Sequence, residues 1–313
     1  MQSQPSRTRR RIAVACAATL AGILACGGGE PTEPESPSPS ASDLPIVYAY
    51  GTLGKTGPRN LHLTTADGTT TLALPDLGGD EAYPAWKPGG RDMLVTQTAS
   101  GSTKLLLVNE AGSNVRTVPD VNSIARWSPD GAWIVFANSG SIFLEVMRLD
   151  GTSRRWITSA VGGPRMAHPS WSPNGRVAYT FGDEGGANGL NVQQVDVPFG
   201  GNLTSGPDDQ WPAWSPDGRT IAFSMGLRNA QGGTFYEIGL VNADGSDKRR
   251  LTFDATSIDR APAWSPDGQW VLYERWDQAM TTCSFVRVPV SGGPPVTVVA
   301  GVPNGACGGA SWR

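Results

Sequence analysis

The sequence predicts an all-β fold, a six-bladed β-propeller with four-stranded blades, closed by pairing of strands from its N- and C-terminal ends. Three observations carry this prediction. A tryptophan motif recurs at nearly constant spacing along the chain. Glycine and proline supply 40 and 25 of the 313 residues, a density of turn formers that argues against a helical bundle. Two incomplete units stand at the ends of the repeated region, and each lacks what the other contains.

The repeated motif reads Trp-Ser-Pro-Asp-Gly in its fullest form. It is complete or nearly complete in five copies and truncated in a sixth at the end of the chain. The six repeat tryptophans are Trp86, Trp127, Trp171, Trp214, Trp264 and Trp312. Successive ones lie 41, 44, 43, 50 and 48 residues apart, and a mean near 45 is the size of a four-stranded propeller blade.

Each unit predicts the same order of elements. A short strand ends on the tryptophan, and Ser-Pro-Asp-Gly then makes a tight turn, because proline fixes φ and the glycine position tolerates the turn geometry. Second strands are predicted at 93–97, 133–137, 177–181, 221–225 and 271–275. Third strands such as 105–109, 142–149 and 238–242 follow a variable loop, and a second turn leads to a fourth strand such as 250–252.

The two ends of the repeated region predict how the ring closes. Residues 46–50 match the second strand of a blade but have no tryptophan strand before them, whereas residues 310–313 are a tryptophan strand with nothing after it. Joined, they complete one blade and bring the total to six. Closure of this kind removes the exposed strand edges that would invite aggregation.

These motifs resemble the TolB-type propeller repeat, which also occurs, more loosely, in prolyl oligopeptidase-like enzymes and in oligogalacturonate lyase. The resemblance covers residues 46–313 and implies the propeller fold. It implies much less about function, because propellers host many functions. TolB proteins carry an α/β domain before the propeller, and residues 27–45 are too short and too polar to form one. The resemblance therefore implies a TolB-like protein rather than TolB itself.

The first 45 residues predict an export signal and a tether. Four arginines precede an apolar run of 14 residues, 12–25, which is shorter than the roughly 20 that span a bilayer. The run ends in Ile23-Leu24-Ala25-Cys26, which resembles a bacterial lipobox and implies a signal peptide over 1–25 and a diacylated Cys26. An ordinary secretory signal is the alternative, and the arginines also fit a twin-arginine export motif. The composition of residues 26–45 predicts a disordered tether.

The mature protein is expected to be a monomer of the bacterial cell envelope that contacts membrane through its lipid alone. Gly27 follows the lipidated cysteine, which by similarity to enterobacterial sorting rules favours the outer membrane, with the propeller in the periplasm or at the cell surface. Beyond the four arginines of the signal, 21 basic residues face 28 acidic ones. A chain with this balance has no electrostatic reason to bind nucleic acid.

Functional residues are expected where the repeats differ. The periodic tryptophans are explained by packing between blades rather than by an aromatic ligand platform, and the turn aspartates by capping of backbone N–H groups. The variable loops are predicted to share one face, here called the loop face, with the links that enter each innermost strand and rim the central tunnel. These loops lie at roughly 51–60, 98–104, 138–141, 182–189, 226–236 and 276–283.

The links predict a binding site at the tunnel mouth. Its predicted residues are Glu81, Tyr83, His168, Asp209, Trp211, Asp259 and Arg260. The three carboxylates lie five residues before a repeat tryptophan, where they could bind a basic peptide or Ca²⁺, or else be solvated loop residues. The three rings lie three residues before it, where they could grip a peptide or a sugar, or else pack on a neighbouring link. No other metal or cofactor is predicted.

Two further cysteines predict a disulfide. Cys16 falls in the signal peptide and Cys26 is the lipid site, so Cys283 and Cys307 remain as an even pair in an exported protein. Both are expected on the loop face, where a bond between them would brace the last blade beside the closure. A pair of unrelated thiols is the alternative.

The sequence predicts a binding protein rather than an enzyme. His62 is expected in the third strand of the closing blade and His168 on the tunnel rim, so a histidine-rich metal site is excluded. Neither a His-Glu-x-x-His nor a Gly-x-Ser-x-Gly motif occurs. The expected function is a scaffold that binds an envelope protein or peptide at the loop face and tunnel mouth. The alternatives are a lipoprotein that binds carbohydrate or a small ligand, and a degenerate hydrolase-associated propeller.

Overall fold

The chain folds as a six-bladed β-propeller. The computed structural model describes residues 44–52, 58–137, 143–158, 165–182, 189–197, 200–206, 208–230, 232–254, 256–301 and 304–313. These residues form six antiparallel sheets of four strands each. The described residues include no helix that is long and apolar enough to cross a membrane.

Each sheet is one blade, whose four strands follow one another from the tunnel outward. Blade 1 consists of β24 (Gly305–Trp312), β1 (Ile46–Thr52), β2 (Asn60–Thr64) and β3 (Thr71–Ala73). Blade 2 consists of β4 (Asp80–Trp86), β5 (Asp92–Ala99), β6 (Ser102–Asn109) and β7 (Arg116–Thr117). Blade 3 consists of β8 (Ala125–Trp127), β9 (Trp133–Ala137), β10 (Leu144–Arg148) and β11 (Arg155–Trp156).

The remaining three blades repeat this order. Blade 4 consists of β12 (Arg165–Trp171), β13 (Arg176–Gly182), β14 (Gly189–Gln194) and β15 (Gly201–Asn202). Blade 5 consists of β16 (Gln210–Trp214), β17 (Thr220–Arg228), β18 (Thr234–Asn242) and β19 (Arg249–Arg250). Blade 6 consists of β20 (Ser257–Trp264), β21 (Trp270–Asp277), β22 (Cys283–Pro289) and β23 (Val296–Val299).

The hydrophobic core lies between the blades. The first strands of successive blades contact one another all the way round, from β24 through β4, β8, β12, β16 and β20 back to β24. Buried apolar residues form six clusters among the described residues, each shared by two neighbouring blades. No blade can bury its faces alone, so the ring stabilises itself only when every neighbour is present.

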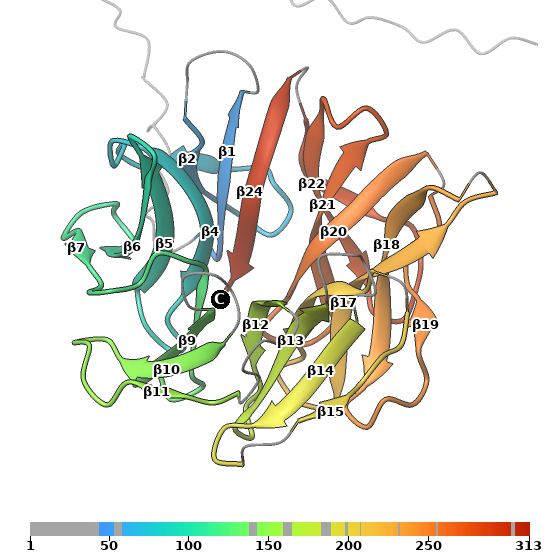
Figure 1. Cartoon of the computed structure of the whole chain (residues 1–313). Helices are drawn as coiled ribbons and strands as arrows, with labels where there is room; N and C mark the ends of the chain where they lie inside the picture. The colour runs from blue at the N-terminus through green and yellow to red at the C-terminus, as the bar shows by residue number, and fades with distance from the viewer. Residues whose placement is uncertain are drawn as a thin grey trace, which may run out of the picture. The chain divides into compact units, whose positions relative to one another are not determined.

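The predicted closure is confirmed. In Figure 1 the first strand of the ring, β1, lies beside the last, β24. The two pair antiparallel, with Ile46 opposite Trp312, Val47 opposite Ser311 and Tyr48 opposite Ala310. The N-terminal segment therefore supplies three strands of blade 1 and the C-terminal segment supplies the innermost one.

The predicted disulfide is also confirmed. Cys283 opens β22 of blade 6, and Cys307 lies in β24 of blade 1, with their Cα atoms 5.8 Å apart. Both cysteines are buried in the apolar cluster between these blades. The bond therefore ties the closing strand covalently to its neighbouring blade.

Replacing both cysteines with alanine, Cys283→Ala/Cys307→Ala, is expected to destabilise the fold by about 3 kcal/mol, the usual effect of opening a loop of this length. The loop spans 24 residues of sequence. The measurement is the urea unfolding midpoint by tryptophan fluorescence, with the single variant Cys283→Ala as the control that breaks the same bond. An unchanged midpoint in both variants would contradict the bracing role.

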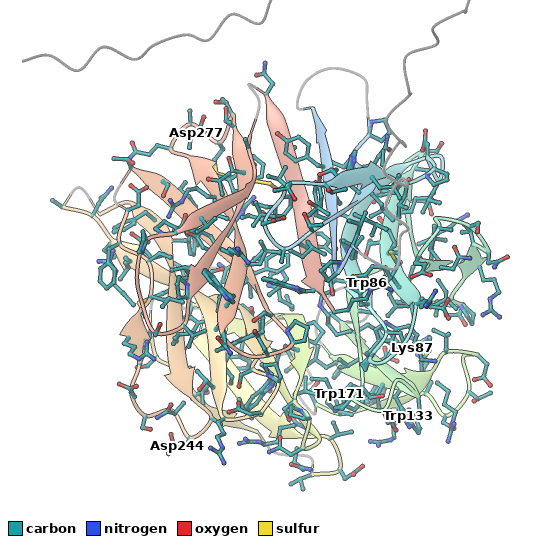
Figure 2. The ribbon with its side chains drawn as sticks, turned by 180° about the vertical axis from the view of Figure 1, so that it is seen from behind. Trp86, Lys87, Trp133, Trp171, Asp244 and Asp277 are labelled. Carbon is teal, nitrogen blue, oxygen red and sulfur yellow. A yellow bond between two sulfur atoms is a disulfide. The ribbon has the colours of Figure 1, made fainter. Side chains whose placement is uncertain are left out.

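The turns behave as predicted and define two faces. In blades 3, 5 and 6 the turn aspartate accepts a backbone N–H two residues on, and the turn glycine N–H bonds the serine carbonyl. Figure 2 shows Asp277, at the end of β21, and Asp244, in the turn after β18, at opposite ends of the propeller. The end with the Ser-Pro-Asp-Gly turns and Asp244 is here called the turn face, and the other is the loop face.

The structure corrects several predicted boundaries. The loop expected over 98–104 is a tight turn, because β5 and β6 pair as far as Ala99 opposite Ser102 and only Ser100 and Gly101 join them. The tether was predicted to extend to residue 45, yet Leu44 is fully buried in the core. The predicted signal peptide, Cys26 and the rest of the tether lie outside the described residues.

Candidate functional site

The innermost strands share an unusual backbone conformation three residues before the repeat tryptophan. Five blades have a left-handed residue there, with φ between 52° and 85°; these are Tyr83, His168, Trp211, Ala261 and Gly309. In the same five blades the register with the second strand shifts at this point. A positive φ is uncommon for residues other than glycine and costs free energy, so four of these positions hold strained backbone inside the tunnel.

Hydrogen bonds from neighbouring blades hold three of these bulges. The N–H of Trp211 donates to Thr180 Oγ1 at 3.2 Å, and the N–H of Ala261 donates to Ser224 Oγ at 3.1 Å. At the equivalent place in blade 1, the N–H of Gly309 donates to Glu274 Oε1 at 2.7 Å. Each acceptor comes from the second strand of the preceding blade, so the bulges are fixed by ring assembly.

The bulges bring the three predicted rings together. The Tyr83 ring stacks on Trp211 with centroids 5.1 Å apart, and the His168 ring stacks on Trp211 at 3.5 Å. Blades 2 and 5 face each other across a six-membered ring, so rings that meet from Tyr83 and Trp211 must lie across the tunnel. These three residues are here called the aromatic plug. Their predicted convergence is observed, although it occurs in mid-tunnel rather than at the rim.

The electrostatics of the aromatic plug keep it uncharged at neutral pH. Burial, with the nearby charges of Arg126 and Arg260, lowers the pKa of His168 to about 3. Burial and the negative charge of Glu274 raise the pKa of Tyr83 above its usual value. Both rings therefore remain neutral and act as apolar surfaces.

The three predicted carboxylates are not at the tunnel mouth. Glu81, Asp209 and Asp259 are all fully buried. Glu81 accepts the backbone N–H groups of Leu61 and Leu77, at 3.0 and 2.8 Å. Burial raises the pKa of Glu81 to about 7, against the effect of these two N–H groups.

The other two carboxylates form buried ion pairs. Asp209 pairs with Lys248 at 2.6 Å, and Asp259 makes two bonds of 2.8 Å with the guanidinium of Arg275. With each carboxylate bound to its own partners, the structure does not bring the three together. No group of three or more His, Cys, Asp or Glu that could hold a metal ion occurs among the described residues. The prediction that these carboxylates converge on an acidic rim is wrong, because all three are buried against separate partners.

Arg260 of the predicted site lies in the tunnel wall. Its Nε donates to Glu274 Oε2 at 3.4 Å, and its guanidinium lies 4.9 Å from the centre of the Trp276 ring. Glu274 also accepts the indole N–H of Trp276 at 3.0 Å. Glu274 therefore contacts Arg260, the Trp276 indole and the Gly309 bulge. Its negative charge balances the positive charge of Arg260 on this side of the tunnel.

A cavity of about 190 Å³, here called the tunnel chamber, lies between the aromatic plug and the repeat tryptophans. Its walls are mostly proline, alanine and aromatic rings, and no Asp or Glu occurs among the described residues that line it. The chamber also contains Arg126, which sequence reasoning missed. The signal was available, because the residue just before the repeat tryptophan is Ala or Ser in the other five copies.

A second, larger hollow of about 640 Å³, here called the funnel, lies at the turn face. All six repeat tryptophans line it, together with the prolines of the Ser-Pro-Asp-Gly turns. It shares Trp86, Trp127, Trp171 and Ser311 with the tunnel chamber, so the two adjoin. In Figure 2 Lys87, another funnel residue, lies on the Asp244 side of Trp86.

The repeat tryptophans pack as predicted, and they also line a hollow. The indole N–H of Trp127 donates to the Ala85 carbonyl of the preceding blade at 3.0 Å. The indole N–H of Trp264 donates to Ala213 in the same way at 2.9 Å. The buried indole N–H groups of Trp86 and Trp214, by contrast, have no hydrogen-bond partner in the described part of the chain. The same tryptophans pack between blades and line the funnel.

Comparison with solved structures places this fold among TolB propellers. TolB from Acinetobacter baumannii superposes with a TM-score of 0.73 at 19% identity, over 88% of this chain and 67% of that one. A protein from Agrobacterium tumefaciens assigned as TolB gives a TM-score of 0.64 at 18% identity, over 86% and 99%. No protein-family model matches the chain. In its fold, the chain is a TolB-like six-bladed propeller.

The same fold also occurs in an enzyme. Oligogalacturonate lyase in complex with manganese superposes with a TM-score of 0.52 at 13% identity, over 81% of this chain and 72% of that one. The fold alone therefore does not separate binding from catalysis. The described residues of this chain do not fit such a metal, because its two histidines lie in different blades and no cluster of metal-ligating side chains forms.

Proposed function

We propose that the chain is a binding protein of the bacterial cell envelope, whose propeller holds a segment of a protein partner at the turn face. The observation that carries this proposal is the funnel of tryptophan and proline rings, which leads into the tunnel chamber and ends at the aromatic plug. The loop face, which the sequence favoured, loses one of its arguments, because the three carboxylates expected there are buried.

The walls of the funnel suit a polypeptide. Proline and tryptophan rings are rigid, so little side-chain entropy is lost when a segment packs on them. Aromatic-lined grooves are a recurring way to bind extended, proline-rich chains. Within the described part of the chain, no Asp or Glu side chain and no cluster of metal ligands lines the tunnel chamber or the funnel, which favours binding over catalysis.

The proposal is tested by position-specific crosslinking in whole cells. A photoreactive amino acid replaces Lys87 at the funnel or, as the matched control, Ser102 at the tip of the β5–β6 hairpin on the loop face. One defined protein adduct from position 87 and none from position 102 is the expected result. Adducts from position 102 alone would overturn the choice of face. Selective retention of the protein on a glycan array, with no protein adduct, would favour the carbohydrate-binding alternative.

The proposal includes a lipid anchor at Cys26. The mature protein is expected to partition into the detergent phase of a Triton X-114 extraction, because an acylated cysteine buries its chains at about 0.8 kcal/mol per CH₂. The variant Cys26→Ala should leave the protein in the aqueous phase or block its processing. Detergent partitioning that survives this substitution would contradict the anchor, and Cys16→Ala, inside the signal peptide, is the control that should change nothing.

A further inference from the structure

At one level of the tunnel chamber, the charge of the lining residues departs from the sixfold pattern of the blades. This level consists of the residues just before the repeat tryptophans, and all six of them line the chamber. They are Ala85, Arg126, Ser170, Ala213, Ala263 and Ser311. Five of these residues are small, and their size leaves room for the single arginine. Periodic residues build a propeller, so a residue that departs from the period in its charge calls for another explanation.

Arg126 has no counter-ion within the described part of the chain. The one hydrogen bond that its guanidinium makes there joins Nη1 to the adjacent carbonyl of Ala125 at 3.0 Å. Burial lowers the pKa of Arg126 to about 10, which leaves it charged at neutral pH. Removing a cation from water without a partner is costly, and the arginine fork is suited to a bidentate anion.

Two hydroxyl groups face the same chamber with a hydrogen to donate. Ser170 Oγ accepts the backbone N–H of Trp214 at 3.0 Å, and Ser311 Oγ accepts that of Trp86 at 3.1 Å. Neither hydroxyl hydrogen has an acceptor among the described residues. Ser170 belongs to blade 4 and Ser311 to blade 1, which stand opposite each other in the ring. Donors therefore approach the chamber from both sides.

We propose that Arg126, Ser170 and Ser311 form an anion site in the tunnel chamber that receives the terminal carboxylate of a peptide held in the funnel. The charge of Arg126 selects a negative group, and no Asp or Glu of the described residues lines either hollow to oppose it. The tryptophan and proline rings of the funnel select a largely apolar body behind it, although Lys87 and Arg313 also line this hollow. This inference rests on the proposed function for the peptide, whereas the anion site itself rests on the chamber.

The first arm of the test uses one pooled octapeptide library, synthesised once with free C-terminal carboxylates and once as C-terminal amides. The full-length protein is immobilised and retained peptides are quantified by mass spectrometry. The free acids should be retained at least about tenfold more than the amides, the ratio that one charge-assisted pair supports. Arg126→Met should abolish this preference, while Arg126→Lys should restore part of it.

Arg91→Met is the matched control, because Arg91 is an exposed arginine whose side chain is 71% accessible and pairs with Glu110. It should keep the wild-type preference. Thermal unfolding of each variant checks that the propeller is intact. Equal retention of acids and amides by a folded wild-type protein would overturn the anion site while leaving peptide binding in place.

The second arm separates the anion site from the peptide. Benzoate and its neutral analogue benzamide are titrated by calorimetry into the wild-type protein and Arg126→Met. Benzoate binding that exceeds benzamide binding and disappears with Arg126 supports the site. If benzoate binds in this way but neither library is retained, the site stands and peptide binding fails. Benzoate binding that is absent, or that survives Arg126→Met, overturns the site.

Discussion

A chain that ends at residue 304 is expected to lose cooperative unfolding altogether. Such a chain lacks β24, the innermost strand of blade 1 and the one whose pairing with β1 closes the ring. It also lacks Trp312 and Cys307, which pack in the cluster between blades 1 and 6. These losses all fall at the contact between blades 1 and 6. The free energy that they remove is therefore comparable with the roughly 5–15 kcal/mol that stabilises a whole domain.

The control for this truncation keeps all 24 strands of the described residues but moves the chain ends. The N–H of Arg313 bonds the carbonyl of Pro45 at 3.0 Å, so a short linker can join residues 313 and 44. New ends are then opened between Ser100 and Gly101, in the β5–β6 turn. This permuted chain should unfold in a single transition by circular dichroism, whereas the truncated chain should not. A truncated chain with an unchanged, cooperative transition would contradict the role of the clasp.

The fold could be predicted because the blades repeat the same sequence motif and the same order of strands. Each of the five Trp-Ser-Pro-Asp-Gly copies encodes a strand end and a turn, and their repetition resolves the ambiguity of any single copy. The closure followed from the two half-units, which pair in the predicted way at Tyr48 and Ala310. Strand ends were less accurate, since β17 runs on to Arg228 and shortens the loop expected from 226.

The candidate site was predictable only in part. Equal spacing before the repeat tryptophan grouped Tyr83, His168 and Trp211 correctly, because equivalent positions in a ring point toward a common axis. The same reasoning failed for Glu81, Asp209 and Asp259, since it gave the residue's level along the tunnel but not the side of the strand it faces. A carboxylate in a sequence does not show whether it is solvated or, like Asp259, buried against an arginine such as Arg275.

Arg126 was missed for a related reason. Sequence reasoning looked for differences in the links, whereas this difference lies inside the repeat itself. The lone arginine beside a repeat tryptophan is visible in the sequence, but its significance depends on the equivalent positions of the other blades lining the same chamber. That fact comes from the diameter of the ring, which no single repeat encodes.

The acid sensitivity of the fold is expected to depend on His168. Its ring stacks on Trp211 at 3.5 Å, and burial together with two guanidinium groups lowers its pKa to about 3. In the unfolded chain the pKa returns to about 6.5, so between pH 6.5 and 3 the unfolded state binds more protons than the folded state. Above pH 6.5, His168 therefore makes its full contribution to the free energy of unfolding. This contribution is lost as the pH falls, by about 4 kcal/mol at pH 3.

The variant His168→Phe isolates this effect, because phenylalanine keeps a ring for stacking and cannot bind a proton. The free energy of unfolding is measured by urea titration from pH 7 to pH 3 for both proteins. Glu81 acts in the opposite sense, since its pKa of about 7 makes its contribution fall as the pH rises from 4.5 to 7. The contribution of Glu81 is the same in both proteins, so it cancels in the difference between their free energies of unfolding.

The wild-type protein should lose stability relative to His168→Phe at each step below pH 6.5. The slope of this difference in the free energy of unfolding against pH should approach the value for one proton. His62→Phe is the matched control; His62 stacks on Tyr48 in blade 1, where burial alone lowers its pKa, and it has no part in the aromatic plug. A constant offset between wild type and His168→Phe down to pH 3.5 would show that His168 is free to charge. In that case the His168 ring would be solvated in the folded protein, and the stacked arrangement with Trp211 would not exclude water from it.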